Sequence, residues 1–276
     1  MRAATKDDIP VIAEQLRRAP HENLFARGTL AAFLRGDPSV RVWYRPQELA
    51  GEGEDRSAAV VTQVHANGAI SAPIDGNEEA YASMIERKWE ERLSDGIVQV
   101  SGMTHVLAAV LPYLKEARAG FQRVLSYARL VGAPRSIGPS NLVERVRQVE
   151  PDELDELERC YAGGEWGGQT ASRRDAVLYG RAYVLEVGGQ VGSAAYVHPL
   201  LDDAGIIRAV YTPVALRRHG YATALVEGIS RMLAEEDVTP CLMYDDPAAG
   251  RIYQRIGYRD FGHWRTVQLI SRRGLG

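Results

Sequence analysis

The sequence has 276 residues, which is long for one ordinary domain and enough for two of about 130–140 residues. Its apolar fraction of 45% and charged fraction of 25% are typical of a soluble globular protein. The formal net charge of −3 does not favour a nucleic-acid-binding protein, since such proteins usually carry a basic face.

The cysteines and the N-terminal residues exclude several other classes. The only cysteines, Cys160 and Cys241, lack metal-type neighbours, so we expect neither a disulfide framework nor a metal site. Residues 1–8 are charged where a signal peptide would be apolar, and no apolar run reaches the roughly 18 residues of a membrane span. We therefore expect a cytoplasmic protein with no membrane contact.

The first half of the chain alternates predicted strands and helices. Asn67-Gly68, a dipeptide typical of hairpin turns, separates two apolar runs, and apolar residues every fourth position predict a helix over 78–93. The predicted helices are 6–18, 78–93 and 104–117. The predicted strands are 40–44, 58–64, 68–74, 97–100 and 121–130.

The second half repeats this order without evident residue identity. Gly188-Gly189 marks another two-residue hairpin. The predicted helices are 151–161, 171–179, 218–235 and 248–256. The predicted strands are 183–187, 190–198, 205–212, 240–244, a short one around Tyr258, and 263–269.

A turn-rich stretch, 131–141, separates the two halves and is the natural linker. We therefore expect an α/β (α+β) protein with two similar domains, 1–135 and 140–276. Each domain should contain a mixed, mostly antiparallel twisted sheet flanked by helices.

The chemistry is concentrated after the predicted strand 205–212. Pro213 ends that strand, and Arg217-Arg218-His219-Gly220-Tyr221-Ala222 opens a long helix. The start of a helix offers unpaired N–H groups and a partial positive charge, which together attract phosphate. Gly220 lets a phosphate approach the backbone closely, and Ala222 keeps the next position small. By itself the string could equally be a loop with solvated arginines.

Together with its surroundings this segment resembles the central motif of the GNAT (N-acetyltransferase) superfamily. The first part of the resemblance runs from Val210 to Val226. A second part, from Tyr244 to Tyr258, is similar to the next motif of that family and follows about 20 residues later. The resemblance covers roughly residues 142–269. It implies that the C-terminal half is an acyl-CoA-dependent acyltransferase domain.

The resemblance also implies roles for individual residues. Backbone groups of Val210, Tyr211 and Thr212 would contact the acyl group and the pantetheine arm. The pyrophosphate would be held by the segment that consists of Arg217, Arg218, His219, Gly220, Tyr221, Ala222 and Thr223. Tyr253 on the following helix would protonate the departing thiolate, which is chemically reasonable because an O–H group can meet the charge that develops on sulfur. Tyr253 could instead only pack its helix onto the sheet.

The sequence departs from the family pattern at two points. Asp246 stands where the family often has Asn, so it is first a helix cap and only second a coenzyme ligand. The strand 205–210 contains no acid, although many relatives place a carboxylate there to help deprotonate the amine. Loop position alone suggests other candidates for the base: Glu165, His198, Asp202, Asp203 and Asp245.

Two other segments bear on the acceptor site. The glycine-rich segment 163–168 contains Glu165 and Trp166 and could form a wall of that site or a simple connection. In the first half, the comparable helix start Asp75-Gly76-Asn77-Glu78-Glu79 is acidic and would repel a pyrophosphate. Tyr113, on the predicted helix 104–117 of this half, is most simply a packing residue. We expect a degenerate N-terminal domain that binds no coenzyme and helps form the acceptor site.

The leading hypothesis is an N-acyltransferase, most simply an N-acetyltransferase, that uses acetyl-CoA or another acyl-CoA as co-substrate. The acceptor would be an amine, most simply of a small molecule, and would attack directly in a ternary complex, since no Ser-His or Cys-His pair is apparent. A non-catalytic acyl-CoA sensor or assembly module is an alternative. A long-chain or carrier-protein-bound donor is another.

Overall fold

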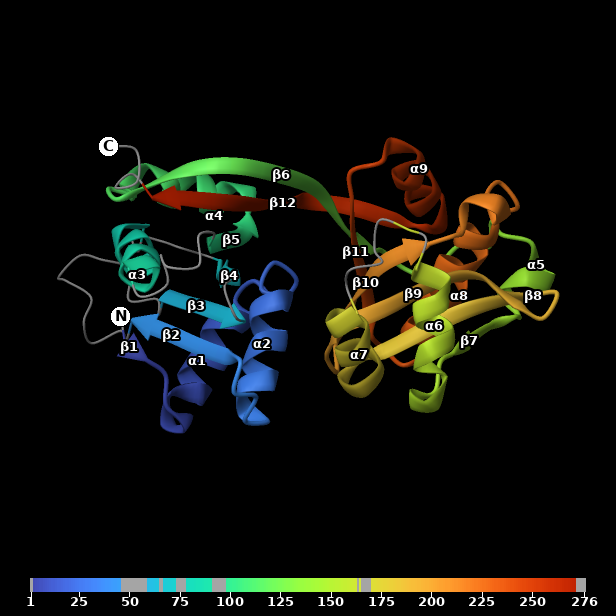
Figure 1. Ribbon diagram of the computed structural model, residues 1–276, viewed down its shortest axis with the longest axis horizontal. Coiled ribbons are helices and arrows are strands. Elements are labelled where there is room, and N and C mark those ends of the chain that lie inside the picture. Colours follow the sequence, from blue (N-terminus) through green and yellow to red (C-terminus); the bar gives the residue numbers. More distant parts are fainter. Residues whose placement is uncertain are drawn as a thin grey trace. The chain divides into compact units, whose positions relative to one another are not determined.

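The computed structural model describes residues 2–45, 59–64, 67–72, 78–90, 98–162, 164 and 170–271. It confirms the predicted mixed α/β fold (Figure 1). The chain divides into two compact units. Unit 1 consists of Met1–Leu125 and Gly262–Gly276, and unit 2 consists of Ser126–Phe261.

The strands of unit 1 form a mostly antiparallel sheet in the order β1-β2-β3-β4-β5-β12. The pair β4–β5 is parallel, and the helix α3 lies between these strands in the sequence, so the three elements form a β-α-β unit. Strand bounds are β1 Arg2–Ala3, β2 Val40–Arg45, β3 Ala59–Val64, β4 Asn67–Ile70 and β5 Val98–Met103.

The helices of unit 1 pack apolar residues against this sheet. Their bounds are α1 Ile9–Arg17, α2 Leu24–Leu34, α3 Glu78–Glu90 and α4 Thr104–Val110. Ile12 and Leu16 of α1 and Leu30 of α2 are buried against Val42 and Val60 of the sheet. Burial of such apolar side chains is the main force that holds helices onto a sheet.

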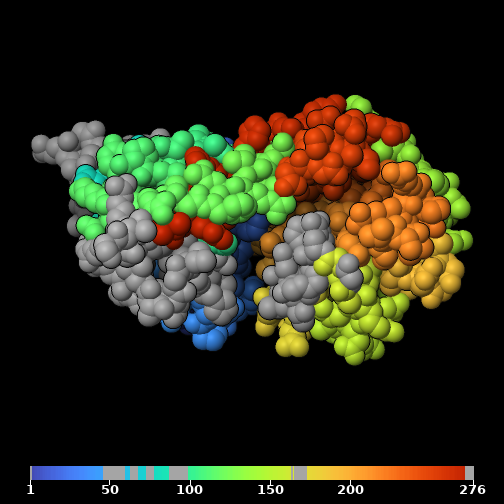
Figure 2. Space-filling model, turned by 45° about the horizontal axis from the view of Figure 1, so that its top comes forward, coloured from blue at the N-terminus to red at the C-terminus, as the bar shows by residue number. Residues whose placement is uncertain are grey.

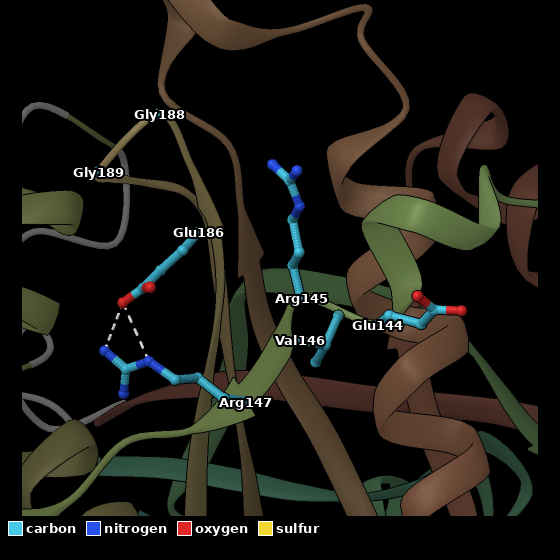
Figure 3. A pocket seen from close by; sticks show the side chains of 7 residues that line it. All are labelled: Glu144, Arg145, Val146, Arg147, Glu186, Gly188 and Gly189. Carbon is cyan, nitrogen blue, oxygen red and sulfur yellow. Dashed lines mark hydrogen bonds and ion pairs between the residues drawn. The ribbon is translucent and has the colours of Figure 1, made fainter.

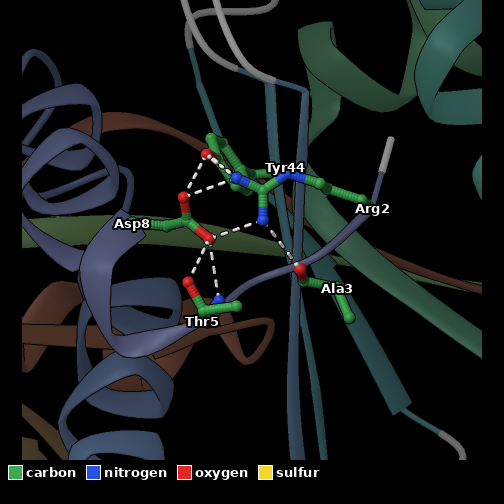
Figure 4. Close-up of polar contacts among 5 residues, drawn as sticks. All are labelled: Arg2, Ala3, Thr5, Asp8 and Tyr44. Atoms are coloured by element: carbon green, nitrogen blue, oxygen red, sulfur yellow. Dashed lines mark hydrogen bonds and ion pairs between the residues drawn. The ribbon is translucent and has the colours of Figure 1, made fainter.

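A polar cluster ties the N-terminal strand of unit 1 to the rest of the unit (Figure 4). The guanidinium of Arg2 donates to both oxygens of Asp8 at 2.8 and 2.7 Å. Thr5 donates to Asp8 Oδ2 through its backbone N–H and its hydroxyl, each at 2.8 Å, and the hydroxyl of Tyr44 also donates to Asp8. These bonds, that of Arg2 first, hold the pKa of Asp8 well below its usual range.

The strands of unit 2 have the order β12-β6-β11-β10-β9-β8-β7, and the pair β10–β11 is parallel. Strand bounds are β7 Val146–Gln148, β8 Arg181–Val187, β9 Gln190–Leu200, β10 Ala204–Tyr211 and β11 Thr239–Tyr244. The long helix α8, Tyr221–Glu235, connects β10 to β11 and thus repeats the β-α-β arrangement of unit 1.

Helices cover both faces of the unit 2 sheet. Ala224, Leu225, Val226 and Ile229 of α8 are buried in one core, which also contains Tyr253. Leu157 and Tyr161 of α6 are buried with Tyr196 and Tyr211 in a second core. The other helices are α5 Ser140–Val143, α6 Leu154–Tyr161, α7 Thr170–Tyr179 and α9 Pro247–Ile256.

The two longest strands, β6 (Ala117–Leu130) and β12 (Tyr258–Ser271), are divided between the units. Strand β6 begins in unit 1, after α4, but its last residues, Ser126–Arg129, pair with β11 in unit 2. In return, Trp264–Leu269 of β12 pair with β5 in unit 1. Unit 2 therefore contains the end of a strand from the N-terminal half of the chain, and unit 1 contains the end of a strand from the C-terminal half. The expected domains, 1–135 and 140–276, differ from the observed units because residues 126–135 belong to unit 2 and residues 262–276 belong to unit 1.

Two local expectations of the first half differ from the structure, and one helix was not expected. Asn67 and Gly68 are ladder residues of β4, paired with Val64 and Gln63, and so do not form the hairpin turn. The helix expected over 104–117 ends at Val110, because Pro112 lacks an N–H group and clashes with the preceding turn. The helix α2 was not predicted at all, since its apolar residues do not follow a clear period.

Tyr113 differs from its expected role as well. Its side chain follows Pro112 in a short 3-10 turn and is 46% exposed, so it is not a core packing residue. No helix in the described ranges is long and apolar enough to cross a bilayer.

Candidate active site

The strands β10 and β11 diverge at the carboxyl end of their parallel pairing. The ladder runs from Ala204 opposite Thr239 to Ile207 opposite Leu242, and the described strands form no further pairs beyond that point. Ala209 has a φ of 50°, and the register of β10 against β9 shifts between Arg208 and Tyr211. This β-bulge turns the end of β10 away from β11 and leaves backbone groups of residues 208–211 without ladder partners on that side.

The loop after β10 leads directly into the start of α8. A 3-10 turn over Val214–Leu216 comes first, and Arg218 and Gly220 follow with φ values of 68° and 79°. The N–H of Ala224 makes a helical bond, at 2.9 Å, to the carbonyl of Gly220. The amides of residues 221–223 therefore precede the helical ladder and carry the positive end of the helix dipole. This part of the chain fits a pyrophosphate.

The loop carries three basic side chains. Arg217, Arg218 and His219 are all exposed. Arg217 Nε donates to the carbonyl of Thr212 at 3.1 Å and thereby closes the loop. The ring of His219 stacks on that of Tyr221 at 5.4 Å. The exposed guanidinium groups of Arg217 and Arg218 and the helix N-terminus together form a locally positive surface in a protein whose net charge is −3.

A buried carboxylate that the sequence analysis missed braces the same helix. Glu227 of α8 is fully buried, and its Oε2 accepts the N–H groups of Ile137 and Gly138 at 2.9 and 2.7 Å. Its Oε1 accepts from Arg231 at 2.5 Å. The segment after β6 is therefore held along the first turns of α8, next to residues 212–220, which we call the phosphate loop after their expected role. The signal in the sequence was an acid on the apolar face of a helix, where an unpaired carboxylate would be costly.

The carbonyl of Tyr211, at the end of β10, is already hydrogen-bonded. Ser193 of β9 donates to it at 2.8 Å, and its hydroxyl also lies 2.9 Å from that of Thr212. The ring of Tyr211 is buried in the core that contains α6. Of the three residues expected to meet the acyl group and pantetheine, Tyr211 and Thr212 thus have carbonyl groups that already accept hydrogen bonds.

Tyr253 lies on α9 and is 8% exposed. Its ring makes edge contacts with Tyr244 at 5.6 Å and Tyr258 at 6.1 Å, so the packing role considered from the sequence is real. Its hydroxyl makes no hydrogen bond within the described residues. Burial, followed by the charge of Asp246, raises the pKa of Tyr253 to about 12. The residue is therefore a neutral O–H donor at ordinary pH.

The start of α9 is fixed by Asp246. Its Oδ1 accepts the N–H of Ala248 at 2.8 Å, which confirms the expected helix cap. Tyr244, at the end of β11, donates to both oxygens of Asp260 at 2.9 and 3.0 Å. Gly250 makes room for this tyrosine, since a Cβ there would lie 2.4 Å from its ring. On the surface of unit 2, the region of α9 (red) lies beside the region that contains the phosphate loop (orange) (Figure 2).

The residues considered as the general base lie in different places. His198 is at the far end of β9, and Asp202 and Asp203 precede β10, so all three lie at the end of the sheet opposite the phosphate loop. Asp245 follows β11 and is exposed at the same end as the loop. Glu165 lies outside the described residues, as does most of the glycine-rich segment 163–168. Gly164 is described, and a Cβ there would lie 2.5 Å from the ring of Tyr211.

A groove of about 410 Å³ lies between the segment 144–147 and the tip of the β8–β9 hairpin (Figure 3). Arg147 is held there by Glu186 and Glu153, with its Nε 2.9 Å from Glu186 Oε1. Arg145 points away from this ion pair. The groove contains none of the expected site residues. Within the described ranges, no group of three or more His, Cys, Asp or Glu residues could hold a metal ion.

The comparisons with known proteins agree with the resemblance found in the sequence. Residues 190–267, which contain the diverging strands, the phosphate loop and α9, match the family model described as FR47-like protein. None of the curated proteins matches the chain significantly.

Several solved structures have a similar fold. A GCN5-related N-acetyltransferase from Kribbella flavida is 17% identical, with a TM-score of 0.62 over 91% of this chain and 95% of that one. A tandem GNAT protein from the clavulanic acid biosynthesis pathway, determined without AcCoA, is 11% identical, with a TM-score of 0.58 over 98% and 97%. A Drosophila protein is 11% identical, with a TM-score of 0.67 over 98% of both chains. At these identities the likeness shows the fold: a GNAT acetyltransferase fold, with a tandem example among the neighbours.

Proposed function

We propose that this chain, which has a GNAT acetyltransferase fold, is an N-acyltransferase that moves an acyl group, most simply acetyl, from acyl-CoA to an amine. The acceptor is most simply a small molecule. The observation that carries the proposal is the pairing of two features in unit 2. The strands β10 and β11 diverge after Ile207, and the helix that begins at Gly220 presents free amides beside that divergence.

The two features together determine the orientation in which the coenzyme binds. The pyrophosphate accepts hydrogen bonds from the amides of Arg218–Thr223, where Arg217 and Arg218 add positive charge. The pantetheine arm, which carries amides of its own, enters between the diverging strands, where residues 208–211 have no ladder partner on the β11 side. The thioester, at the end of the pantetheine arm, then lies between the two diverging strands.

The reaction is a direct transfer. The amine nitrogen attacks the thioester carbonyl carbon, a tetrahedral intermediate forms, and the C–S bond breaks to give the amide and the coenzyme thiolate. The amine must lose a proton to solvent or to a base, since an amine with a pKa of about 10.4 is mostly protonated at neutral pH. Asp245 is the candidate among the described acids that lies at the correct end of the sheet.

Tyr253 acts on the leaving group. A pKa of about 12 lies about 3.5 units above the reference thiol value of about 8.5, so complete proton transfer would be uphill by about 5 kcal/mol. The hydroxyl therefore stabilises the developing thiolate mainly as a hydrogen-bond donor. The proton that the thiolate finally takes up comes from solvent.

The cysteines do not offer a covalent route. Burial raises the pKa of Cys160 to about 11 and that of Cys241 to about 12, so both are protonated thiols and poor nucleophiles. A thioester exchange onto the enzyme would need a thiolate. Direct attack in a ternary complex is the simpler route.

Unit 1 takes no coenzyme in this proposal. Its corresponding helix α3 has Glu78 and Glu79 in the first turn, whereas the first turn of α8 has no acid. Lys115 lies 3.6 Å from Glu79 and offsets only part of this charge. Residues 73–77, which include Asp75, Gly76 and Asn77, lie outside the described residues.

A second candidate function is a coenzyme-binding sensor without turnover. The observation in its favour is that β10 carries Arg208 and no carboxylate, so the usual helper for amine deprotonation is missing. The presence of Tyr253 beside the end of β11 favours the enzyme.

Thiol release separates the two functions. The protein is incubated with acetyl-CoA and a panel of small amines, and free coenzyme thiol is measured over time. Amine-dependent release supports the transferase. Tight binding of acetyl-CoA and of longer acyl-CoA donors without any release supports the sensor. Release only with longer or carrier-bound donors would mean that the donor is one of these and not acetyl-CoA. A protein that binds none of the donors would overturn the proposal.

A further inference from the structure

The bulge at Ala209 is an unusual piece of backbone. A φ of 50° is a left-handed conformation that a residue with a Cβ rarely adopts, and Ala209 is not a glycine. Yet this residue marks the point at which β10 leaves β11. Without a compensating contact, the strand would relax toward regular pairing, because two more residues of each strand could then join the ladder.

The compensating contact comes from α6. The hydroxyl of Tyr161 donates a hydrogen bond of 2.7 Å to the carbonyl of Ala209. This carbonyl therefore points out of the sheet ladder, toward the core covered by α6. Burial raises the pKa of Tyr161 well above its usual value, so the hydroxyl remains a donor throughout the working pH range.

Tyr161 is itself held from two sides. Its ring stacks on Tyr211 at 5.5 Å, and the guanidinium of Arg173 lies 4.7 Å from the ring centre. The side chain of Arg173 is completely buried, and its Nε donates to Glu158 at 2.8 Å. A fully buried arginine that is paired and stacked has little freedom, so the Tyr161 hydroxyl is presented in one position.

We propose that Tyr161 is a positioning residue that stabilises the left-handed bulge at Ala209 and so keeps β10 and β11 apart for the pantetheine arm of acyl-CoA. This inference rests on the proposed function, since it names how the coenzyme cleft of unit 2 is kept formed. Tyr161 does not touch the reacting atoms. It acts through the backbone of Ala209, and the buried Arg173 acts through Tyr161.

The test is Tyr161→Phe, which removes one oxygen and leaves the ring. We expect the dissociation constant for acetyl-CoA to rise about tenfold, while the KM for the amine stays within twofold of wild type. Tyr81→Phe is the matched control. Tyr81 is also fully buried, and its hydroxyl bonds to Ser71 at 2.8 Å, but it belongs to unit 1. This variant should bind acetyl-CoA as the wild type does.

A rescue distinguishes the bulge from a general loss of stability. Glycine adopts a positive φ without strain, so adding Ala209→Gly to Tyr161→Phe should return the acetyl-CoA affinity to within about threefold of wild type. Should Tyr161→Phe fail to fold, Ala209→Val makes the same test, because a branched side chain disfavours the left-handed conformation and should weaken binding where Ala209→Gly does not.

The outcomes separate this inference from the function on which it rests. Wild-type protein that binds no acyl-CoA would refute the proposed function. Wild-type protein that binds acyl-CoA, together with a folded Tyr161→Phe variant of unchanged affinity, would overturn only the role of Tyr161. A loss of affinity that Ala209→Gly does not relieve would also overturn it.

Discussion

Gly220 is the position at which a side chain should most directly separate coenzyme binding from folding. Its φ is +79°, and it caps the N-terminus of α8. A Cβ built there would lie 3.7 Å from Cδ of Pro139, which is an ordinary contact, so a small side chain has room. The cost of Gly220→Ala is therefore one of backbone conformation and not of collision.

The magnitudes follow from the two effects. A left-handed φ costs a residue with a Cβ about 1–2 kcal/mol, so Gly220→Ala should lower the free energy of unfolding by that amount. Gly220→Glu adds a negative charge beside the pyrophosphate. At about 4 Å, two unit charges repel by about 1 kcal/mol in water and about 4 kcal/mol near a protein surface. The affinity for acetyl-CoA should therefore fall between about fivefold and several-hundredfold.

Two further variants isolate the cause. Gly36 in unit 1 has a φ of +83° with nothing within 4 Å of a built Cβ, so Gly36→Ala carries the same backbone cost away from the loop. Gly220→Asn tolerates the left-handed conformation and carries no charge, so both its stability and its affinity for acetyl-CoA should lie closer to wild type than those of Gly220→Glu. The assays are chemical denaturation for stability and calorimetric titration for acetyl-CoA. Gly220→Glu that binds acetyl-CoA within twofold of wild type would refute the assignment of the phosphate site.

Three other predictions concern the leaving group and the N-terminal cluster. Tyr253→Phe should bind acetyl-CoA normally and lower kcat by about a hundredfold in a thiol-release assay; an unchanged kcat removes Tyr253 from the mechanism. Because burial raises the pKa of Tyr253 to about 12, kcat should not fall between about pH 8 and about pH 10, and a fall there in wild type that Tyr253→Phe lacks would contradict the role. Asp8→Asn should lower the free energy of unfolding by about 2 kcal/mol at neutral pH. Since the folded pKa of Asp8 is lowered, its contribution is present above the unfolded value of about 3.9 and is lost as pH falls through the folded pKa. The difference from wild type should therefore shrink in acid, and a constant difference across that range would argue against the Arg2–Asp8 pair.

The positions of strand β10, the loop after it and helix α8 were predictable because their signals are local. Pro213 ends a strand, Gly220 takes a positive φ, and an amphipathic helix follows within a few residues. The hairpin at Gly188-Gly189 is confirmed for the same reason. Both glycines have positive φ, at 59° and 75°, and Val187 pairs with Gln190 across them.

The exchange of strands between the units was not predictable in this way. Strands β6 and β12 read as ordinary apolar strands, and nothing near Ser126 or Trp264 specifies which distant strand each will pair with. Strand pairing depends on tertiary packing, which propensity and periodicity do not report. Asn67-Gly68 illustrates the same limit, since a strong turn dipeptide became part of a ladder.

The supports of the candidate site were hidden for a different reason. Glu227 and Tyr161 occupy apolar helix faces, and their roles depend on the backbone groups of Ile137, Gly138 and Ala209 that the fold brings to them. A polar atom on an apolar face signals a buried hydrogen bond, but the partner cannot be named from the sequence.

Hydrogen exchange at the start of α8 tests the central claim most directly. Acetyl-CoA bound as proposed would accept hydrogen bonds from the amides of Arg218–Thr223, so these amides should exchange more slowly in its presence. The first turn of α3, with Glu78 and Glu79, should show no change. Unchanged exchange at Arg218–Thr223 under saturating acetyl-CoA, or protection at α3 instead, would contradict the placement of the coenzyme in unit 2.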